Sequence, residues 1–541
     1  MKRYISILTA IAIVVILPIA FKRTNISLSD KADDTLVIIT PHNEAIRLEM
    51  DLGFREWYLK KTGRTVAIDW RVPGSTGDII RYIHSIYNNA FRVYWENSLK
   101  KDWTPEVQEG FVTKHPETIL EAEARECFLH SDVSCGIDLF FGGGVVEHKK
   151  EAELGDTVPS GVIELHPDWF CDDCIPARKD GDYLWDPQGV WIGTSLSSFG
   201  IMYNTDRIQD LQLPSAPTTW TDLTNPEFFR QIAMVDPVQS SVVIKSLEMI
   251  FQQQMQQARK EILAKTHQEN LNEQQLREAL NEGWLRGLKV VQKIMANSRY
   301  FTDNSVTTVW DVSLGNCAVG VVVDFYGRHQ KSSTVSRGGK DRISFVFPKG
   351  GSCYSPDPIS MFRGAPHKEV AKAFMEYVVS EAGQDRVGFR TGVPGGPKYY
   401  ALHRTPLRRD FYQEEKSPWM SSPEMDPFKT VNEFEYQAQW TAPAFGSIRF
   451  LAKVLFMDPF TELASAWHAI IKAQKEGRKE QATNALALLE NFEGITYDWT
   501  INTLSKVLKS KNALLRINLE TELTQRYCNQ YKEAYKEASK K

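Results

Sequence analysis

The stretch WIGTSLSSFGIMYN, residues 191–204, is a long β-type run rich in small hydroxyl residues. A second β-type run, RISFVFP at 342–348, leads through glycines into a helical pattern at 369–383. A chain that leaves one α/β lobe, builds a second lobe and returns needs two such crossing strands. We therefore predict a two-lobed protein whose hinge consists of these two strands.

The residues before the first crossing strand alternate between short β-branched runs and helical patterns. Strands are expected at 36–40, 65–72 and 136–141, and helices at 45–63, 77–91 and 145–154. Such a β-α-β-α-β-α order predicts a parallel sheet with helices on both faces. We assign residues 31–195 to the first lobe, which the returning chain completes with 347–410.

The residues after that strand build the second lobe, 196–346, and a tail. Further strands are expected at 231–236 and 316–325, and long helices at 240–262 and 274–297. The tail, 411–541, becomes mostly helix-forming from Phe460 onward and ends in a Lys/Glu-rich segment that is typical of a solvated helix. The expected fold class is α/β, with two lobes, a two-strand hinge and a helical C-terminal extension.

The N-terminus has the pattern of an export signal. Lys2 and Arg3 precede an apolar run at 5–21, and Lys22 and Arg23 follow it. This segment, 1–24, is either a cleaved signal or a single retained membrane anchor. No cysteine follows the run, which argues against a lipoprotein anchor. The rest of the chain is then expected in the periplasm or elsewhere outside the cytoplasm, tethered if the segment is retained.

Composition excludes some classes of function. The chain has 541 residues, 42% hydrophobic and 24% charged, and is too long for a single hydrophobic core. Its formal net charge of −4 lacks the strong basic excess of a nucleic-acid-binding surface. We expect a globular monomer that does not bind nucleic acid.

Polar and glycine residues gather after the predicted strands, where an open α/β sheet binds its ligands. Hydroxyls and glycines at helix N-termini favour an anionic or heavily hydroxylated ligand. The candidate ligand-binding residues are His42, Asn43, Glu44, Ser75, Thr76, Gly142, Gly143, Gly144, Ser197, Ser198, Asp236, Ser240, Ser241, Asp324, Tyr326, Tyr354 and Asp357.

Each of these signals has a structural alternative. Ser75, Thr76, Ser240 and Ser241 are equally suited to capping their own helices. The glycines at 142–144 fit neither GxGxxG nor a GxxxxGK[ST] phosphate loop, and taken alone they fit a tight turn as well as a ligand site.

Patterns of catalytic residues are sparse. The sequence contains neither a GxSxG nucleophile elbow nor an HExxH zinc motif. His42 and Glu44 are close enough in sequence to act as acid and base. Cys171 and Cys174 form a CxxC pair in a loop, for which a structural disulfide, to each other or to Cys127 and Cys135, is preferred over a redox pair or half a zinc site.

Several motifs together resemble the extracellular solute-binding proteins of ABC importers. They are YNTD at 203–206, PxxWxxL at 217–223, DPxxSS at 236–241, FPKGG at 347–351 and HKEVAKAFMEYVVSEAGQ at 367–384. The resemblance covers roughly residues 35–405. It is greatest to the ferric-ion binders and their relatives, which include sugar-phosphate and phosphonate binders.

The resemblance implies two lobes that close over a small solute or ion, breaking no bond, and deliver it to an ABC permease in the inner membrane. The expected protein is not an enzyme and needs no cofactor. Ferric-ion binders of this group commonly use adjacent tyrosines. Here the pair Tyr399-Tyr400 lies near the end of the matched region, and the cleft is expected to offer another set of oxygen ligands for iron: Asp324, Tyr326, Tyr354 and Asp357.

The hydroxyl and glycine residues that follow the predicted strands favour an anionic organic solute, such as a sugar phosphate or phosphonate, as the ligand. Ferric iron is the alternative. Two other classes of function stay open at this point. One is an exported hydrolase using His42 and Glu44, or a thiol oxidoreductase using Cys171 and Cys174. The other is a membrane-anchored sensor domain that only binds its ligand.

Overall fold

The computed structural model describes residues 32–429, 433–510 and 512–540. The predicted export signal or membrane anchor, 1–24, lies outside these residues. Within the described ranges, no helix combines the length and the apolar character that crossing a membrane requires.

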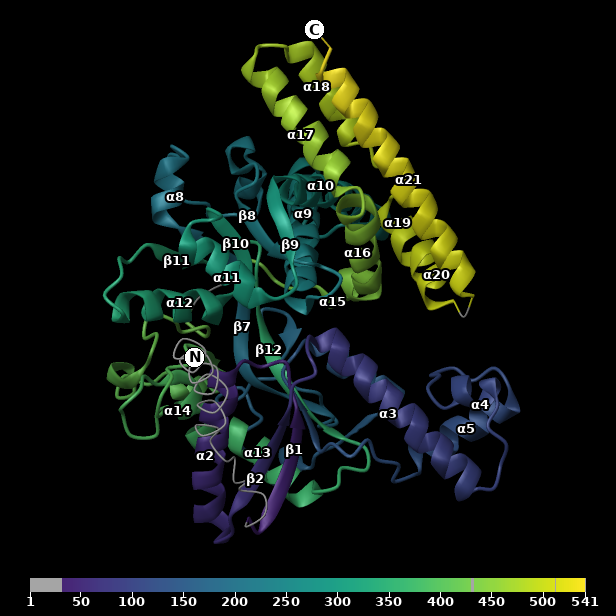
Figure 1. The fold of residues 1–541 in the computed structure, drawn as a ribbon, viewed down its shortest axis with the longest axis vertical. Helices are drawn as coiled ribbons and strands as arrows, with labels where there is room; N and C mark the ends of the chain where they lie inside the picture. The colour runs from purple at the N-terminus through teal and green to yellow at the C-terminus, as the bar shows by residue number, and fades with distance from the viewer. Residues whose placement is uncertain (1–31, 430–432, 511, 541) are drawn as a thin grey trace, which may run out of the picture.

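Strand β7 (Trp191–Asn204) runs through both halves of the molecule (Figure 1). Its first half pairs antiparallel with β12 (Tyr354–Phe362), and its second half pairs with β10 (Val319–Val323) and β11 (Ile343–Val346). We call the part on the β12 side the first lobe and the part on the β10 side the second lobe. One continuous strand therefore joins the two sheets, as the sequence predicts for 191–204.

The first lobe is a sheet covered on both faces. Strand β1 (Asp34–Ile39) lies between β2 and β3, and both of these pairings are parallel. Leu36 and Ile38 of β1 contribute to one hydrophobic core, whereas Val37 and Ile39 contribute to a second core on the opposite face. A strand buried on both sides needs a continuous apolar run, which is the pattern of residues 36–39.

The other elements of the first lobe follow in sequence order. They are α2 (Glu44–Thr62), β2 (Val66–Arg71), α3 (Thr76–Asn97), α4 (Pro105–Gly110), α5 (Ile119–Leu129), β3 (Leu139–Phe141), α6 (Val145–Leu154), β4 (Thr157–Val158), α7 (Val162–Leu165), β5 (Arg178–Lys179) and β6 (Asp182–Tyr183), and, from the returning chain, α13 (Lys368–Val379), α14 (Glu381–Gly388) and β13 (Thr405–Pro406).

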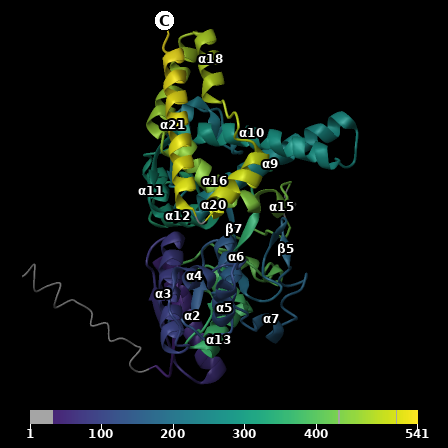
Figure 2. The same ribbon diagram turned by 90° about the vertical axis from the view of Figure 1, so that its right-hand side faces the viewer.

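The second lobe has the sheet order β7-β10-β8-β9, in which β10, β8 and β9 are parallel. Its elements are α8 (Thr205–Asp210), β8 (Ile232–Val235), α9 (Ser241–Thr266), α10 (Glu273–Asn297), β9 (Ser298–Thr302), α11 (Ser305–Leu314) and α12 (Asp324–Ser336). The α9–α10 hairpin projects from the body of the molecule (Figure 2).

Close packing along this hairpin depends on two glycines of α10. A Cβ atom on Gly283 would lie 2.2 Å from the Cα atom of Met255, and one on Gly287 would lie 2.5 Å from the ring of Phe251. Glycine inside a helix costs about 1 kcal/mol relative to alanine, and here the close approach of the two helices explains its presence.

From Ala438 onward the C-terminal extension is mostly helical, as predicted, and this part packs on the second lobe (Figure 1). Just before it, Phe434 and Tyr436 pack into a core of the first lobe. A single hydrophobic core contains side chains of α9, α10 and the extension. The helices of the extension are α15 (Ala438–Thr441), α16 (Phe445–Leu451), α17 (Phe460–Lys475), α18 (Lys479–Leu489), α19 (Tyr497–Trp499), α20 (Ser505–Lys509) and α21 (Ala513–Ala538).

The return of the chain to the first lobe differs from the prediction. Residues 342–348 are expected to form the second crossing strand, but β11 pairs only with the second-lobe half of β7. Strand β12, which the sequence analysis misses, takes the first-lobe half. Pro356 and Pro358 make this segment look unlike a strand in the sequence, because proline cannot donate a ladder hydrogen bond. In the structure the pairing with β7 is irregular between Asp357 and Pro358, which accommodates the two prolines.

The predicted disulfides do not form in the structure. All seven cysteines lie within the described residues, and all are free. The Cys171 thiol donates to the carbonyl oxygen of Asp168, and the Cys174 thiol contacts Asp410 Oδ2 at 3.5 Å. Because Cys171 is exposed and Cys174 is buried, the two side chains of the CxxC turn lie in different environments.

Candidate functional site

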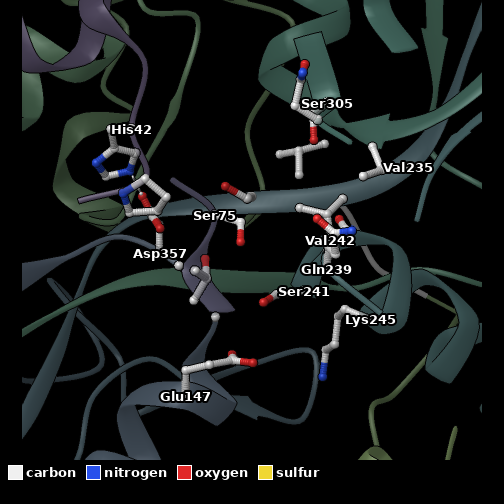
Figure 3. Close-up of a pocket in the computed structure, with 18 of the residues that line it drawn as sticks. His42, Ser75, Glu147, Val235, Gln239, Ser241, Val242, Lys245, Ser305 and Asp357 are labelled. Carbon is white, nitrogen blue, oxygen red and sulfur yellow. Dashed lines mark hydrogen bonds and ion pairs between the residues drawn. The ribbon is translucent and has the colours of Figure 1, made fainter. Parts of the chain in front are cut away.

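A cavity of about 640 Å³ lies between the two lobes, beside β7 (Figure 3). His42 and Asp357 lie on one side of it, and Val235, Val242 and Ser305 lie on the other. The first lobe and the second lobe therefore each supply part of the wall.

Helix N-termini dominate the lining of this cavity. The lining includes residues at the N-terminal ends of four helices: Ser75 and Thr76 of α3, Gly144 and Val145 of α6, Ser240 and Ser241 of α9, and Asn304 and Ser305 of α11. Asn43, the N-cap residue of α2, also lines it. A helix N-terminus carries a partial positive charge and free N–H groups, so this arrangement favours a negatively charged ligand.

The capping alternative is confirmed for two of the predicted serines. Ser75 Oγ accepts the N–H of Asp78 at 3.3 Å, and the Asp78 carboxylate accepts the N–H of Ser75 at 2.8 Å, which makes a capping box. Ser240 Oγ accepts the N–H of Val243 at 3.3 Å. Both serines also line the cavity, and their contact with a ligand stays a prediction.

The glycines at 142–144 make the turn that leads into α6. Gly142 and Gly143 have φ angles of +88° and +99°, which L side chains rarely adopt. A Cβ atom on Gly142 would lie 2.5 Å from the ring of His42. Gly144 is the N-cap residue of α6 and provides no side-chain cap. The first helical residues, Val145 and Val146, line the cavity.

A buried ionic cluster of three residues lies at the first-lobe side of the cavity. Asp357 Oδ2 lies 2.7 Å from His42 Nε2 and 2.5 Å from Arg404 Nη2. Burial alone would raise the pKa of Asp357, but Arg404 and His42 hold it well below its usual range. Burial lowers the pKa of His42. The cluster therefore contains an ionised carboxylate, a guanidinium and a neutral imidazole.

Five other charged residues line the cavity: Arg47, Lys245, Glu147 and the two aspartates Asp78 and Asp303. Within the described residues, the buried Arg47 Nε has no hydrogen-bond partner. Lys245 is compensated, because its Nζ lies 3.0 Å from Glu248 and 3.5 Å from the ring centre of Tyr436. Glu147 contacts Arg449 with one carboxylate oxygen at 3.4 Å, and its buried Oε2 is unpartnered among the described residues.

The structure places eleven of the predicted ligand-binding residues in the lining. They are His42, Asn43, Ser75, Thr76, Gly143, Gly144, Ser197, Ser240, Ser241, Tyr326 and Asp357.

The other six lie outside it: Glu44, Gly142, Ser198, Asp236, Asp324 and Tyr354. Ser198 follows Ser197 on β7, and successive strand residues face opposite ways. Asp236 accepts the N–H of Val238 within its own turn. Glu44 is exposed in the first turn of α2.

Of the four expected iron ligands, Tyr326 and Asp357 line the cavity, and Asp324 and Tyr354 do not. Asp324 is buried and pairs with Arg328 at 2.7 Å, and Asp357 pairs with Arg404. Tyr354 packs against Phe347, whereas Tyr326 lines the cavity. Because each carboxylate already has a guanidinium partner, an iron ion there would have to displace an ion pair.

The residues of the two catalytic alternatives do not meet in this cavity. Glu44 lies outside the cavity that His42 lines, and His42 contacts Asp357 instead. Cys171 and Cys174 also lie outside the lining.

Sequence reasoning missed Arg47, Glu147, Arg404 and the start of α11. Arg47 and Glu147 lie in the first turns of α2 and α6, directly after strand ends that the sequence analysis identified. Including the first turn of each following helix among the candidates would have found both. Arg404 reaches the site from far along the chain, and no local pattern marks it.

Comparison with known proteins gives a family and several related structures. The family model for bacterial extracellular solute-binding proteins matches residues 133–403, about half of the chain. An uncharacterized protein of Haemophilus influenzae is 22% identical over 253 residues, which cover 46% of this chain and 60% of that protein.

Three solved structures of periplasmic or iron-binding proteins are similar at low identity. AfuA of Actinobacillus pleuropneumoniae, with exogenous fructose-6-phosphate bound, is 16% identical, with a TM-score of 0.42 over 66% of this chain and 82% of its own. The apo ferric ion-binding protein A of Pasteurella haemolytica is 13% identical, with a TM-score of 0.47. The match covers 77% of this chain and 96% of that protein. The Trichodesmium protein IdiA, in complex with iron and citrate, is 16% identical, with a TM-score of 0.43. The match covers 77% of this chain and 98% of that protein.

The family match begins just before β3 and ends beside Arg404, so it takes in β7, β12 and most of the second-lobe wall of the cavity. The chain belongs to the family of bacterial extracellular solute-binding proteins.

Proposed function

We propose that this protein captures an anionic organic solute, such as a sugar phosphate or a phosphonate, in the cavity between its lobes. The solute is then delivered to an ABC permease. Solute-binding proteins bind small ligands outside the cytoplasm and work with such permeases, and they are not enzymes. The observation that carries the ligand class is the convergence of helix N-termini from both lobes on one cavity.

Arg47 supports an anionic ligand independently of the helices. Its guanidinium lines the cavity, and its buried Nε has no partner among the described residues. A buried donor without an acceptor is costly, and a phosphate or phosphonate would provide an acceptor for Nε and a bidentate partner for the guanidinium.

Glu147 adds a requirement on the rest of the ligand. Its unpartnered Oε2 is an acceptor in the same cavity. A bare anion would be repelled by this carboxylate, whereas a solute that also carries hydroxyl or amino donors would satisfy it. We therefore expect an organic anion with donor groups rather than inorganic phosphate.

A thermal-shift screen of the purified protein tests the proposal. The probes are fructose 6-phosphate, glucose 6-phosphate, 2-aminoethylphosphonate, inorganic phosphate, uncharged glucose and ferric citrate. At about 100 Kd a ligand stabilises the folded state by roughly 2.7 kcal/mol. We expect an organic phosphate or phosphonate to raise the melting temperature more than glucose or phosphate does. A shift with ferric citrate alone would overturn the anionic-solute proposal in favour of iron.

Arg47→Ala, measured with the best probe of that screen, identifies the site. We expect a loss of at least tenfold in affinity, because the positive charge and the unpartnered Nε donor of Arg47 are removed. Arg55→Ala is the matched control, since Arg55 lies two turns further along α2 and pairs with Asp51 outside the cavity. Equal affinity in the two variants would place the ligand elsewhere.

A further inference from the structure

Helices α3 and α6 are joined by a cluster of three metal-ligating side chains away from the cavity. His84 lies on α3, Glu151 lies on α6, and Asp156 follows α6 directly. His84 Nε2 is 3.0 Å and 3.1 Å from the two Glu151 carboxylate oxygens and 3.9 Å from Asp156 Oδ2. The site starts about 9–12 Å along these helices from their ends at the cavity, at 1.5 Å per residue.

The two carboxylates of this cluster are buried without enough positive charge. The side chains of Glu151 and Asp156 are only 1% and 2% exposed, and that of His84 is 41% exposed. Asp156 Oδ1 is buried and has no hydrogen-bond partner among the described residues. Two buried carboxylates side by side are costly unless a cation or a proton compensates them.

The nearest arginines do not provide that compensation directly. Arg125 donates to the carbonyl oxygens of Phe111 and Glu153, and Arg363 donates to those of Gly155 and Leu129. In the part of the chain that the structure describes, neither of them forms an ion pair with Asp156.

We propose that His84, Glu151 and Asp156 bind a divalent transition-metal ion of the Zn²⁺ type. Their ligand atoms all lie within 4.8 Å of one another. Ligand atoms about 2.1 Å from a tetrahedral ion are roughly 3.4 Å apart, which is close to the spacings in the cluster. One imidazole nitrogen with two carboxylate oxygens is a donor set that Zn²⁺ accepts, and the exposed side of His84 leaves room for a water molecule as the fourth ligand.

Such an ion would tie α3 to α6. Because both helices begin at the cavity, the ion would hold together one part of the first-lobe wall. This role is structural, and it does not depend on which solute the cavity binds.

Titration of the EDTA-treated full-length protein with Zn²⁺ by calorimetry, together with thermal shifts, tests the proposal. Mn²⁺ and Mg²⁺ serve as comparison ions. We expect one Zn²⁺ per chain and a rise in melting temperature that Mg²⁺ does not produce. Glu151→Gln and Asp156→Asn should abolish the rise, and His84→Ala should weaken binding by tenfold or more. His115→Ala, which removes an exposed histidine of the same lobe, should bind as wild type.

The variants also separate this site from a proton-sharing carboxyl pair. If the pair only shares a proton, Asp156→Asn stabilises the EDTA-treated protein and wild type shows no Zn²⁺-specific shift, which overturns the proposal. Equal Zn²⁺ binding by wild type and His84→Ala overturns it as well. His84→Ala decides the matter if the carboxyl variants do not fold, because its half-exposed side chain contributes little to the core.

Discussion

At the scale of single residues, His148 holds the glycine turn against the sheet. Its Nε2 lies 3.0 Å from the carbonyl oxygen of Gly142, and its Nδ1 lies 2.6 Å from Ser360 Oγ. The ring stacks on Phe140 with 4.1 Å between the ring centres. Burial lowers the pKa of His148 to about 4, so the imidazole is neutral at pH 7. In the sequence His148 stands among charged residues, Glu147, Lys149 and Lys150, yet its side chain is fully buried.

His148 predicts a loss of stability in acid. The unfolded state takes up a proton near pH 6.5, whereas the folded state does so only near pH 4, so the free energy of unfolding falls as the pH drops through that window. At pH 5 this difference in proton uptake lowers the free energy of unfolding by about 2 kcal/mol relative to neutral pH. Urea unfolding at pH 7 and pH 5 should show a smaller difference for His148→Gln than for wild type. His115→Gln is the control, and an unchanged difference in His148→Gln would contradict the prediction.

Replacing Gly142 with alanine should produce a local clash, and a second glycine variant separates this clash from backbone strain. Gly142→Ala places a methyl group against the His42 ring in a residue with φ of +88°. Gly494→Ala has a similar φ of +81° but nothing within 4 Å. The left-handed conformation costs each variant about 1–2 kcal/mol. We expect Gly142→Ala to lose more stability than Gly494→Ala in chemical unfolding. Equal losses would mean that the His42 ring moves aside freely.

At the scale of elements, the start of α3 performs two tasks. The capping box at Ser75 satisfies the N–H groups at the helix end, and the same end forms part of the cavity wall. The long α10 has an equivalent capping box at Asn272, in the exposed connection between α9 and α10. The two helices are therefore capped in the same way, but of the two N-cap residues only Ser75 lines the cavity.

Ser75→Ala and Asn272→Ala form a matched pair. Loss of either cap should cost about 1 kcal/mol of folding stability. Because Ser75 lines the cavity, we expect only Ser75→Ala to weaken binding of the best anionic probe as well. Melting temperatures with and without the probe measure both effects. Equal probe-induced shifts in the two variants would show that Ser75 acts as a cap alone.

At the scale of the whole molecule, the C-terminal extension and the second lobe form one packed unit. The Tyr531 hydroxyl of α21 donates to the carbonyl oxygen of Leu455 and accepts from Gln292 of α10. Trp284 of α10 donates to the carbonyl oxygen of Ile495. These contacts lie within a core that contains residues of the sheet and of the extension. From Trp440 onward the extension therefore shares one hydrophobic core with the second lobe.

Tyr531 and Tyr535 test this coupling. Tyr531 is fully buried, whereas Tyr535, one turn later on α21, is 48% exposed. Tyr531→Ala should cost about 3–5 kcal/mol, as large aromatic-to-alanine changes in cores do, and Tyr535→Ala should cost little. Amide hydrogen exchange should become faster in α10 as well as α21 for Tyr531→Ala. Unchanged exchange in α10 would show that the extension unfolds independently.

Local patterns in the sequence determined most of the elements. Helix α6 and strand β7 begin and end where the sequence predicts. Buried β-branched runs and helical periodicity are properties of neighbouring residues, so the alternation of strands and helices, the α/β class and the helical extension could all be derived from them. The helix caps were also local, because an N-cap side chain bonds to residues only two or three positions away.

Only the tertiary structure decided which of those residues share a site. Arg404 and Asp357 reach His42 from more than three hundred residues away, and no local spacing encodes their meeting. Strand β12 is also invisible locally, since its prolines are tolerated only because of how it pairs with β7. Charge pairing and cavity shape depend on contacts that form after the lobes pack, which is why the strand-end residues were predictable and their partners were not.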